Sequence, residues 1–349
     1  MAETIIITGN MGYVGPEVVA IFRKLDPTKK LIGLDAGFFA TCLMNRAELP
    51  ERRLDEQHFI DIRNVTVDFF TDAACVIHLA AVSNDPMGKA FERPTIEINT
   101  AATAALGRMA KTAGVRRFVF ASSCSIYGST GNDAKTEAAP LDPLTAYARS
   151  KLASERELEK IADERFQVTC LRFATACGFG ERLRLDLVLN DFVASAVATG
   201  EIKVLSDGTP WRPLIHVKDM ARLFHWASSR PLETGAFLAV NAGRDDWNYQ
   251  IRELAEAVAG LIPGSHVSIN KHASPDNRSY KVDFGLLASL APAGLIEYDL
   301  TRTVRELHHG LSSNAFRDVD FRSSDFIRLK VLSQLVDNGR LDRNLYWQA

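Results

Sequence analysis

Short apolar runs alternate with helical patterns through the first half of the chain. Thr4–Thr8 is a β-branched apolar run, typical of a strand buried on both faces of a parallel sheet. Similar runs predict five more strands, at residues 30–35, 58–61, 75–81, 117–121 and 167–171. Helical patterns lie between some of them, at residues 16–25 and 95–113. Strands that alternate with helices indicate a parallel α/β sheet with right-handed connections.

Beyond about residue 179 the pattern changes, and helices and short strands interleave with longer connections. Helical patterns occupy residues 187–199, 250–260, 304–312 and 325–338, and strand-like patterns occupy residues 202–205, 236–241 and 266–270. A chain of 349 residues favours one large domain with a smaller one. We therefore expect an α/β fold, with a Rossmann-type doubly wound parallel sheet in residues 1–178. A later segment, at about residues 210–245, is expected to return to that sheet, and residues 179–349 are expected to form a smaller α/β portion.

Composition and charge exclude several classes of protein. The net charge is −2 with 24% charged residues, and no basic run is present, so nucleic-acid binding is not expected. The five cysteines lie far apart without a C-x-x-C pattern, which predicts neither a disulfide framework nor a zinc site, and no metal is expected. No apolar segment reaches transmembrane length and no signal-peptide pattern is present. The expectation is a protein without a membrane partner, located by default in the cytoplasm.

A glycine-rich turn follows the first strand directly. Gly9, Gly12 and Gly15 form a G-x-x-G-x-x-G motif between this strand and the next helix. Such glycines let a pyrophosphate approach the backbone, and the helix N-terminus supplies free N–H groups and a favourable dipole. Asp35 ends the second strand, where its carboxylate can accept hydrogen bonds from both ribose hydroxyls, and the residues that follow offer no cation for a 2′-phosphate. The motif therefore favours NAD over NADP, the alternative being a glycine turn that serves packing alone.

Tyr147 and Lys151 form a Tyr-x-x-x-Lys pair in a helix that Pro143 is expected to open, with Asp142 as its N-cap. A spacing of four residues is about one helical turn, so the phenol and the ammonium share a face. A nearby cation favours the phenolate, whose phenol otherwise has a pKa of about 10, and the pair can then transfer protons near neutral pH. The alternative is a solvated helix face on which the two side chains meet by accident.

The glycine spacing and the Tyr147–Lys151 pair resemble the short-chain dehydrogenase/reductase superfamily, specifically its extended branch, the NAD-dependent epimerase/dehydratase family. Further matching stretches lie at residues 61–63, 78–81, 122–128 and 207–219, and at Asn99. The resemblance implies a nucleotide-sugar enzyme similar to the 4-epimerases. NAD would be bound by residues 1–178, and a nucleotide-diphosphate sugar would be bound mainly by residues 179–349. The resemblance also implies a homodimer that pairs through the helices carrying Asn99 and Tyr147.

By this resemblance, Ser123, Tyr147 and Lys151 would be catalytic. Tyr147 would take a sugar hydroxyl proton as hydride leaves for the nicotinamide. Lys151 would bind the nicotinamide ribose and lower the Tyr147 pKa, helped by the positive charge of the cofactor. Ser123 would bind the reacting oxygen, although a strand-end hydroxyl can also serve the backbone alone. Asp61 and Ile62 would contact adenine, and Asn99 would support the site through backbone bonds. The remaining implied cofactor contacts are Gly9, Met11, Gly12, Tyr13, Val14, Gly15, Asp35, Leu79, Ala80, Ala81 and Phe173.

Substrate contacts are implied mainly in the second half. Arg212 and Arg278 match family positions that hold a diphosphate through charge-assisted hydrogen bonds, with surface ion pairs as the alternative. Arg182 and Asn190 are candidates for substrate contact or for stabilising a loop, and Thr175 stands where many relatives carry an asparagine. The full implied set is Ser83, Asn84, Ser123, Ser125, Tyr147, Thr175, Arg182, Asn190, Arg212 and Arg278.

The two residues after Ser123 discriminate between reactions. The 4,6-dehydratases of the family carry Asp and Glu there, whereas this chain has Cys124 and Ser125, so elimination of water lacks its acid and base. What remains is epimerisation at C4 through a transient 4-keto sugar, with NAD kept bound. An NAD-dependent nucleotide-sugar dehydrogenase or 4-keto-sugar reductase would use the same groups, and a non-catalytic NAD-binding sensor or scaffold is the alternative from another class. Cys124 or Ser125 could be a second proton donor, and Cys124 could equally be a small filler at the strand end.

Overall fold

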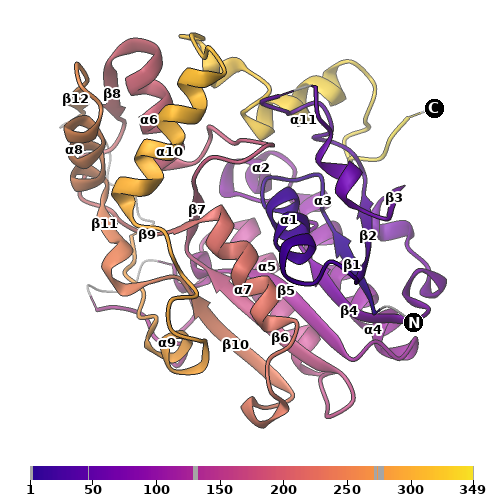
Figure 1. The fold of residues 1–349 in the computed structure, drawn as a ribbon. Coiled ribbons are helices and arrows are strands. Elements are labelled where there is room, and N and C mark those ends of the chain that lie inside the picture. Colours follow the sequence, from indigo (N-terminus) through magenta and orange to yellow (C-terminus); the bar gives the residue numbers. More distant parts are fainter. Residues whose placement is uncertain (1–2, 46, 129–132, 271–272, 274–278, 349) are drawn as a thin grey trace.

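The computed structural model describes residues 3–45, 47–128, 133–270, 273 and 279–348. Its centre is a seven-stranded sheet in the order β10-β6-β5-β4-β1-β2-β3, in which every neighbouring pair is parallel (Figure 1). The strands are β1 (Thr4–Thr8), β2 (Lys30–Asp35), β3 (Glu56–Phe59), β4 (Ala73–His78), β5 (Arg117–Ser123), β6 (Gln167–Phe173) and β10 (Phe237–Ala242). The order reverses beside β1, as in a doubly wound Rossmann-type sheet, and the predicted fold class is confirmed.

Helices cover both faces of this sheet because alternate residues of each strand point to opposite sides. In β1, Ile5 and Ile7 join the core that contains α1 (Gly15–Leu25) and α7 (Val217–Ala227), whereas Ile6 faces the other core. The helices of that other face are α2 (Asp85–Ala90), α3 (Glu92–Ile96), a π-helical turn (Glu97–Ala102), α4 (Thr103–Thr112) and α5 (Ala146–Glu159).

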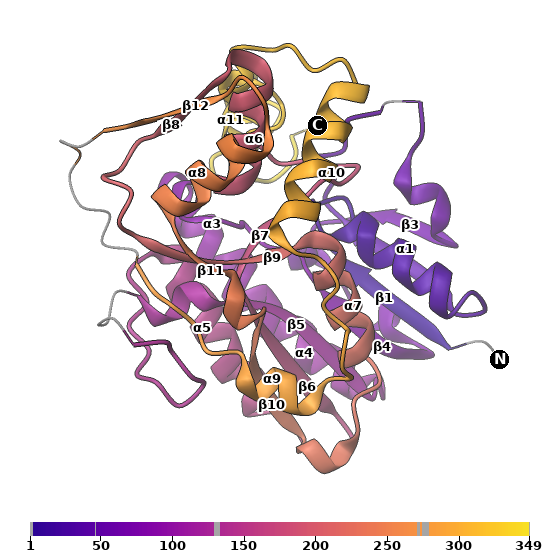
Figure 2. The same cartoon turned by 60° about the vertical axis from the view of Figure 1, so that its left-hand side comes forward.

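The second half adds a smaller α/β portion. Its helices α6 (Val188–Thr199), α8 (Ile251–Leu261) and α10 (Leu300–Ser313) bury Val193, Leu254 and Leu307 in a separate core. Figure 2 shows this helical group to one side of the seven-stranded sheet. The remaining elements are β7 (Thr175–Cys177), β9 (Trp211–His216) and β11 (Asn248–Gln250) in one small sheet, β8 (Glu201–Val204) and β12 (His266–Ile269) in another, α9 (Gly285–Leu290) and α11 (Arg328–Asp337).

Two late segments return to the large sheet. β10 pairs with β6, and α7 packs against α1, so part of the expected segment at residues 210–245 lies with the first half. The C-terminal segment does the same, because Leu332, Leu341 and Leu345 are buried in the core that contains Ile6. The packing of the C-terminal segment was not expected, since only residues 210–245 of the second half were expected to return to the sheet.

The helix that carries Tyr147 begins later than predicted. α5 starts at Ala146, and its N-cap is Thr145, whose hydroxyl accepts a hydrogen bond of 3.1 Å from the Ala148 amide. Asp142 is therefore not the cap, and Pro143 precedes the helix rather than opening it. The backbone amide of Asp142 instead donates to the Ile126 carbonyl at 3.1 Å.

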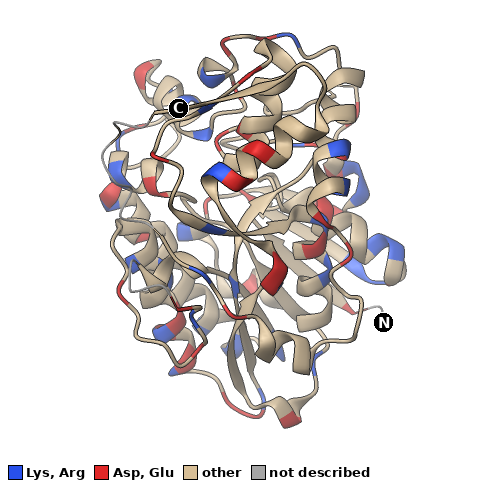
Figure 3. Ribbon diagram, turned by 90° about the vertical axis from the view of Figure 1, so that its left-hand side faces the viewer, with Lys and Arg blue, Asp and Glu red and all other residues tan. Residues whose placement is uncertain are grey.

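Acidic and basic residues are interspersed over the molecule, as the ribbon in Figure 3 shows. All five cysteines are free and buried. Within the described ranges, no helix has both the length and the apolar character needed to cross a membrane. The same residues contain no group of three or more side chains that could hold a metal ion.

Candidate active site

A cavity of about 770 Å³ opens where strands of the large sheet end and the smaller portion begins. This position, outside the carboxyl ends of parallel strands, is where open α/β sheets bind ligands. Many of the residues predicted for the site line this one cavity. They are Gly9, Gly12, Tyr13, Val14, Asp35, Asp61, Ile62, Leu79, Ala80, Ala81, Ser83, Asn84, Ser123, Ser125, Tyr147, Lys151, Phe173, Thr175 and Arg212.

Five other predicted residues lie within the described part of the chain but do not line the cavity. They are Met11, Gly15, Asn99, Arg182 and Asn190. Arg278, the second arginine expected at a diphosphate, lies outside the described residues.

The glycine turn has two different structural requirements. Gly9 has a φ of +72°, and a Cβ there would lie 2.5 Å from the Ala80 nitrogen. A Cβ at Gly15 would lie 2.1 Å from the Asn10 carbonyl oxygen. Both glycines are therefore required by the packing of the turn itself. Gly12 lines the cavity and would meet only the Gly9 oxygen, at 3.2 Å, so it leaves the space that a bound group needs.

Asp35 joins the end of β2 to this turn. Its carboxylate accepts hydrogen bonds from the backbone amides of Met11 at 3.0 Å and Gly37 at 2.7 Å. Burial raises the pKa of Asp35, while the two amides and the charge of Arg182 lower it. The Arg182 guanidinium donates to the Phe39 and Ala40 carbonyls and pairs with Glu51, so its bonds are made within the protein. The cradle of small residues with a carboxylate at its rim fits the adenosine half of NAD.

Ser123, Tyr147 and Lys151 converge on one part of the cavity. The Ser123 hydroxyl accepts a hydrogen bond of 3.2 Å from the Ser125 amide and lies near the Tyr147 phenol, whose pKa it lowers. The Lys151 ammonium donates to the Ala121 carbonyl at 2.7 Å and lies 5.8 Å from the centroid of the Tyr147 ring. The predicted sharing of one helix face is therefore observed.

The ionisation of the pair differs from the expectation. Burial raises the pKa of Tyr147 to about 12, although the nearby Ser123 hydroxyl and the positive charge of Arg184 lower it. Burial also lowers the pKa of Lys151 to about 7, against the opposing effect of Glu155. The protein's own groups thus do not bring the phenol near neutrality, and a further positive charge beside it would favour the phenolate.

A buried ion pair lies behind these residues. Arg172 on β6 donates to Glu155 on α5 at 2.8 Å from Nη2 and at 3.1 Å from Nε. Glu155 also accepts a hydrogen bond from Ser122, and the Arg172 Nη1 donates to the Tyr127 hydroxyl at 3.1 Å. Because Glu155 is one helical turn beyond Lys151 and Ser122 adjoins Ser123, the network fixes the catalytic strand end against the catalytic helix.

Sequence reasoning missed Arg184 and Asp186. Arg184 lines the cavity, donates to the Ser83 hydroxyl at 3.1 Å and pairs with Asp186 at 2.8 Å. Asp186 in turn accepts a hydrogen bond of 3.0 Å from Asn84. The chosen candidate was Arg182, two residues earlier, whose side chain is fully buried and lies outside the cavity. In the sequence, the two arginines lie in one loop and look alike as candidates. Only the fold determines that Arg184, and not Arg182, lines the cavity.

The asparagine candidates also turn out to support the backbone. Asn190 accepts a hydrogen bond from the Gly178 amide at 2.9 Å and donates to the Arg184 carbonyl at 2.8 Å. Asn99 accepts from the Val82 amide at 2.8 Å and donates to the Ser150 hydroxyl at 3.0 Å. Asn99 thus supports the site through backbone bonds, as expected. Arg182 and Asn190 make the loop-stabilising contacts that were the alternative to substrate contact.

The two residues after Ser123 have different surroundings. Cys124 is buried, its thiol donates to the Arg172 carbonyl at 2.9 Å, and burial strongly raises its pKa. Cys124 therefore fills the end of the strand and does not line the cavity. The Ser125 hydroxyl lines the cavity and is buried without a hydrogen-bond partner among the described residues. A buried hydroxyl of this kind is expected to bind a ligand or water.

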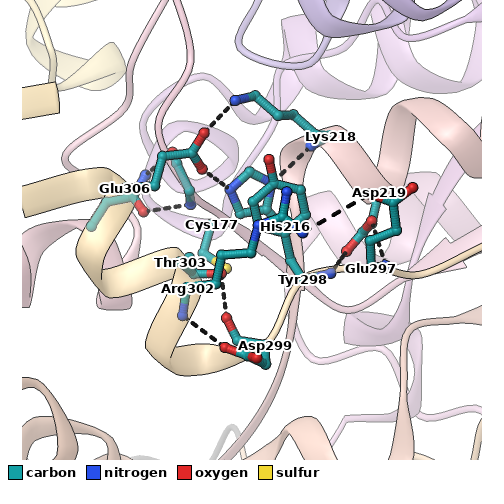
Figure 4. A network of polar contacts seen from close by, with 12 residues as sticks. Cys177, His216, Lys218, Asp219, Glu297, Tyr298, Asp299, Arg302, Thr303 and Glu306 are labelled. Carbon is teal, nitrogen blue, oxygen red and sulfur yellow. Dashed lines mark hydrogen bonds and ion pairs between the residues drawn. The ribbon is translucent and has the colours of Figure 1, made fainter. Parts of the chain in front are cut away.

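A polar network fixes the smaller portion to the sheet (Figure 4). His216 at the end of β9 bonds to Glu306 at 2.7 Å, and its ring stacks on Tyr298 with centroids 3.6 Å apart. Asp219 accepts hydrogen bonds of 3.0 Å from the backbone amides of Glu297 and Tyr298. His216 and Asp219 therefore have a structural role, in fixing α7 to the segment that leads into α10.

A sequence model described as the NAD dependent epimerase/dehydratase family matches residues 5–243. This chain belongs to that family. It is an enzyme of the extended short-chain dehydrogenase/reductase type, and NAD is the cofactor, as the glycine turn and Asp35 predicted.

Individual family members are similar over most of the chain. UDP-glucose 4-epimerase 4 of Oryza sativa subsp. japonica is 28% identical over 267 residues, which cover 66% of this chain and 69% of the relative. The NAD-dependent NDP-hexosamine 5,6-dehydratase TunA of tunicamycin biosynthesis has a TM-score of 0.76 at 21% identity, covering 91% of this chain and 99% of TunA. UDP-glucose-4-epimerase from Stenotrophomonas maltophila has a TM-score of 0.75 at 23% identity, covering 90% and 99%. The two structures establish the shared fold.

Proposed function

We propose that this protein epimerises a nucleotide-diphosphate sugar at C4 and keeps its NAD bound through the reaction. The observation that carries the proposal is the convergence of Ser123, Tyr147 and Lys151 in one cavity, without a carboxylic acid at the two positions after Ser123. The similarity to UDP-glucose 4-epimerases supports it. We further propose the division into an NAD-binding part and a mainly substrate-binding part, and a homodimer.

The cavity suggests where NAD would lie. The pyrophosphate would lie at Gly12 and the N-terminus of α1, and the adenosine ribose at Asp35. Asp61 and Ile62 would contact adenine, and Lys151 would bind the nicotinamide ribose. Bound NAD supplies a hydride acceptor and, once reduced, a hydride donor.

Tyr147 would take the proton of the sugar 4-hydroxyl while the hydrogen on C4 leaves with both its electrons. Ser123, which lines the same cavity as Tyr147, would bind the same sugar oxygen. The positive charge of oxidised NAD would offset the burial that holds the phenol pKa at about 12. Tyr147 would return its proton to the same oxygen once C4 has regained a hydrogen on the other face, so no net oxidation would take place.

The substrate would extend into the smaller portion of the fold. Arg212 lies 5.8 Å from the centroid of the buried Tyr280 ring and lines the cavity, where it would bind the diphosphate together with Arg278. The Ser125 hydroxyl, Thr175 and the Ser83–Asn84 loop would face the sugar.

Dehydration is disfavoured because the carboxylates of the cavity already have partners. Asp85 accepts a hydrogen bond from Thr145 at 2.6 Å, Asp186 pairs with Arg184, and Asp191 pairs with Arg322 at 2.8 Å. A dehydrogenase or keto-sugar reductase would use the same catalytic groups and would differ in releasing its cofactor. A non-catalytic NAD-binding scaffold would not need Ser123, Tyr147 and Lys151 together.

Replacing Tyr147 by phenylalanine tests the mechanism. Tyr147→Phe should lower turnover of an accepted nucleotide sugar by about 10²-fold or more, because the acid–base group is lost, while the bound NAD content stays unchanged. Tyr249→Phe is a matched control, since Tyr249 is half-buried outside the cavity and should retain full turnover. Unchanged turnover in Tyr147→Phe would contradict the assigned role.

A further inference from the structure

The C-terminal segment packs against the part of the cavity assigned to adenosine. α11 contributes Arg328 and Leu332 to the cavity lining, and residues 340–348 continue from it over the ends of β2 and β3. Leu341 and Leu345 are almost fully buried in the same core as Ile62. In Figure 1 this yellow segment lies beside the indigo and purple strands of the N-terminal part.

One end of the segment is tied to the loop after β3. Arg63 donates to the backbone carbonyls of Asn344 at 2.8 Å and Leu345 at 2.9 Å, and its guanidinium lies 3.5 Å from the centroid of the Tyr346 ring. The same Arg63 pairs at 2.5 Å with Asp61, which lines the cavity. One arginine therefore joins the C-terminal segment to a residue assigned to adenine.

The other end is tied to the loop after β2. The Trp347 indole nitrogen donates to the Ala36 carbonyl at 2.6 Å, and the indole lies 5.8 Å from the Phe38 ring between centroids. Ala36 and Phe38 both line the cavity directly after Asp35. Trp347 is 43% exposed, so these two contacts hold it at the surface beside the cavity.

We propose that residues 340–348 act as a clamp that holds the two walls of the adenosine pocket together and so keeps NAD on the enzyme. The loops after β2 and β3 form these walls, and β3 is the short strand at the edge of the sheet, paired only with β2 among the described elements. Arg63 and Trp347 are its positioning residues, since neither lines the cavity itself. The inference rests on the proposed function, because an epimerase that regenerates its cofactor benefits from slow NAD release.

The clamp has local features that stabilise its shape. The Asp342 carboxylate accepts hydrogen bonds from the backbone amides of Asn344 at 2.8 Å and Tyr346 at 2.9 Å. The backbone amide of Gln348 donates to the Arg340 carbonyl at 2.9 Å. These bonds give the segment a fixed turn, so that a change at Trp347 should loosen one attachment without unfolding the rest.

The test is the rate at which purified holoenzyme loses NAD, followed by rapid gel filtration and quantification of the nucleotide that stays bound. We expect Trp347→Ala to release NAD about tenfold faster than the unaltered protein, because both the indole hydrogen bond and the contact with Phe38 are lost. Trp347→Phe keeps a ring and should show a smaller increase. Leu232→Ala, at an exposed position in the turn before β10, should release NAD at the unaltered rate.

Equal release rates in all four proteins would overturn the clamp and leave the epimerase proposal standing. If the unaltered protein turned over only with added NAD, the retained-cofactor mechanism would be contradicted. The NAD release rates of the variants, compared with that of the unaltered protein, would still show whether the clamp slows release. Saturating NAD should restore turnover of Trp347→Ala, since the catalytic residues are untouched. A loss that NAD does not restore would contradict a role confined to cofactor retention.

Discussion

Replacing Glu155 by glutamine should destabilise the protein strongly. Glu155 is 3% exposed and Arg172 is 6% exposed, and two nitrogens of Arg172 lie within 3.1 Å of the carboxylate. Glutamine keeps the shape and can still bond Ser122, but it leaves the guanidinium without a counter-charge in a buried site. Breaking one side of a buried ion pair typically costs about 3–5 kcal/mol.

The same change should alter the pH dependence of turnover. The charge of Glu155 raises the Lys151 pKa against the burial that lowers it to about 7. Without that charge the Lys151 pKa falls further, so the ammonium is lost at a lower pH. We expect the alkaline limb of the pH–rate profile to shift toward lower pH.

Urea unfolding of the single and double variants measures the ion-pair cost. Arg172→Met combined with Glu155→Gln removes both charges and should recover most of the lost stability, since no buried charge remains unpaired. Glu157→Gln, on the solvent side of the same helix, is the matched control and should unfold like the unaltered protein. A loss below about 1 kcal/mol in Glu155→Gln, or a double variant as unstable as the sum of its parts, would refute the reasoning.

Three further changes probe the cofactor end and the catalytic lysine. Gly9→Ala should cost about 1–3 kcal/mol and reduce NAD binding, because of its positive φ and the contact with Ala80, whereas Gly260→Ala should be neutral in the same unfolding assay. Asp35→Asn should weaken NAD binding about tenfold in a fluorescence titration, since ribose hydroxyls lose a charged acceptor. Burial lowers the Lys151 pKa to about 7 from 10.5, so between these values the unfolded chain binds the extra proton. Relative to Lys151→Met, stability should therefore rise with pH there, by at most about 1.4 kcal/mol per unit.

Local signals in the sequence were sufficient for the sheet and for the catalytic pair. Apolar β-branched runs predict strands because a parallel sheet covered on both faces needs them, and Tyr147 and Lys151 share a face because the helix repeat requires it. The cofactor roles predicted for Gly9 and Asp35 follow from their positions at the ends of strands, and both residues line the same cavity.

Tertiary context decided what the sequence could not show. Arg182 and Arg184 are equally plausible in a loop without periodicity, and the packing against Phe39 and Glu51 directs the first of them away from the cavity. Thr145 caps α5 in place of Asp142 because the chain turns there, which local preference does not specify. The C-terminal segment reaches the cofactor end through contacts with residues some three hundred positions earlier, such as Trp347 with Ala36, and no local pattern predicts such a contact.

The most direct test of the central claim is an incubation of purified protein with UDP-, GDP-, dTDP- and CDP-sugars without added NAD. The proposed mechanism predicts that at least one sugar is converted to its C4 epimer while no reduced cofactor accumulates, because the hydride returns to the carbon it left. Product should then form at the same rate when NAD is added. Oxidised sugar and NADH that accumulate only when NAD is supplied would contradict the epimerase and establish a dehydrogenase.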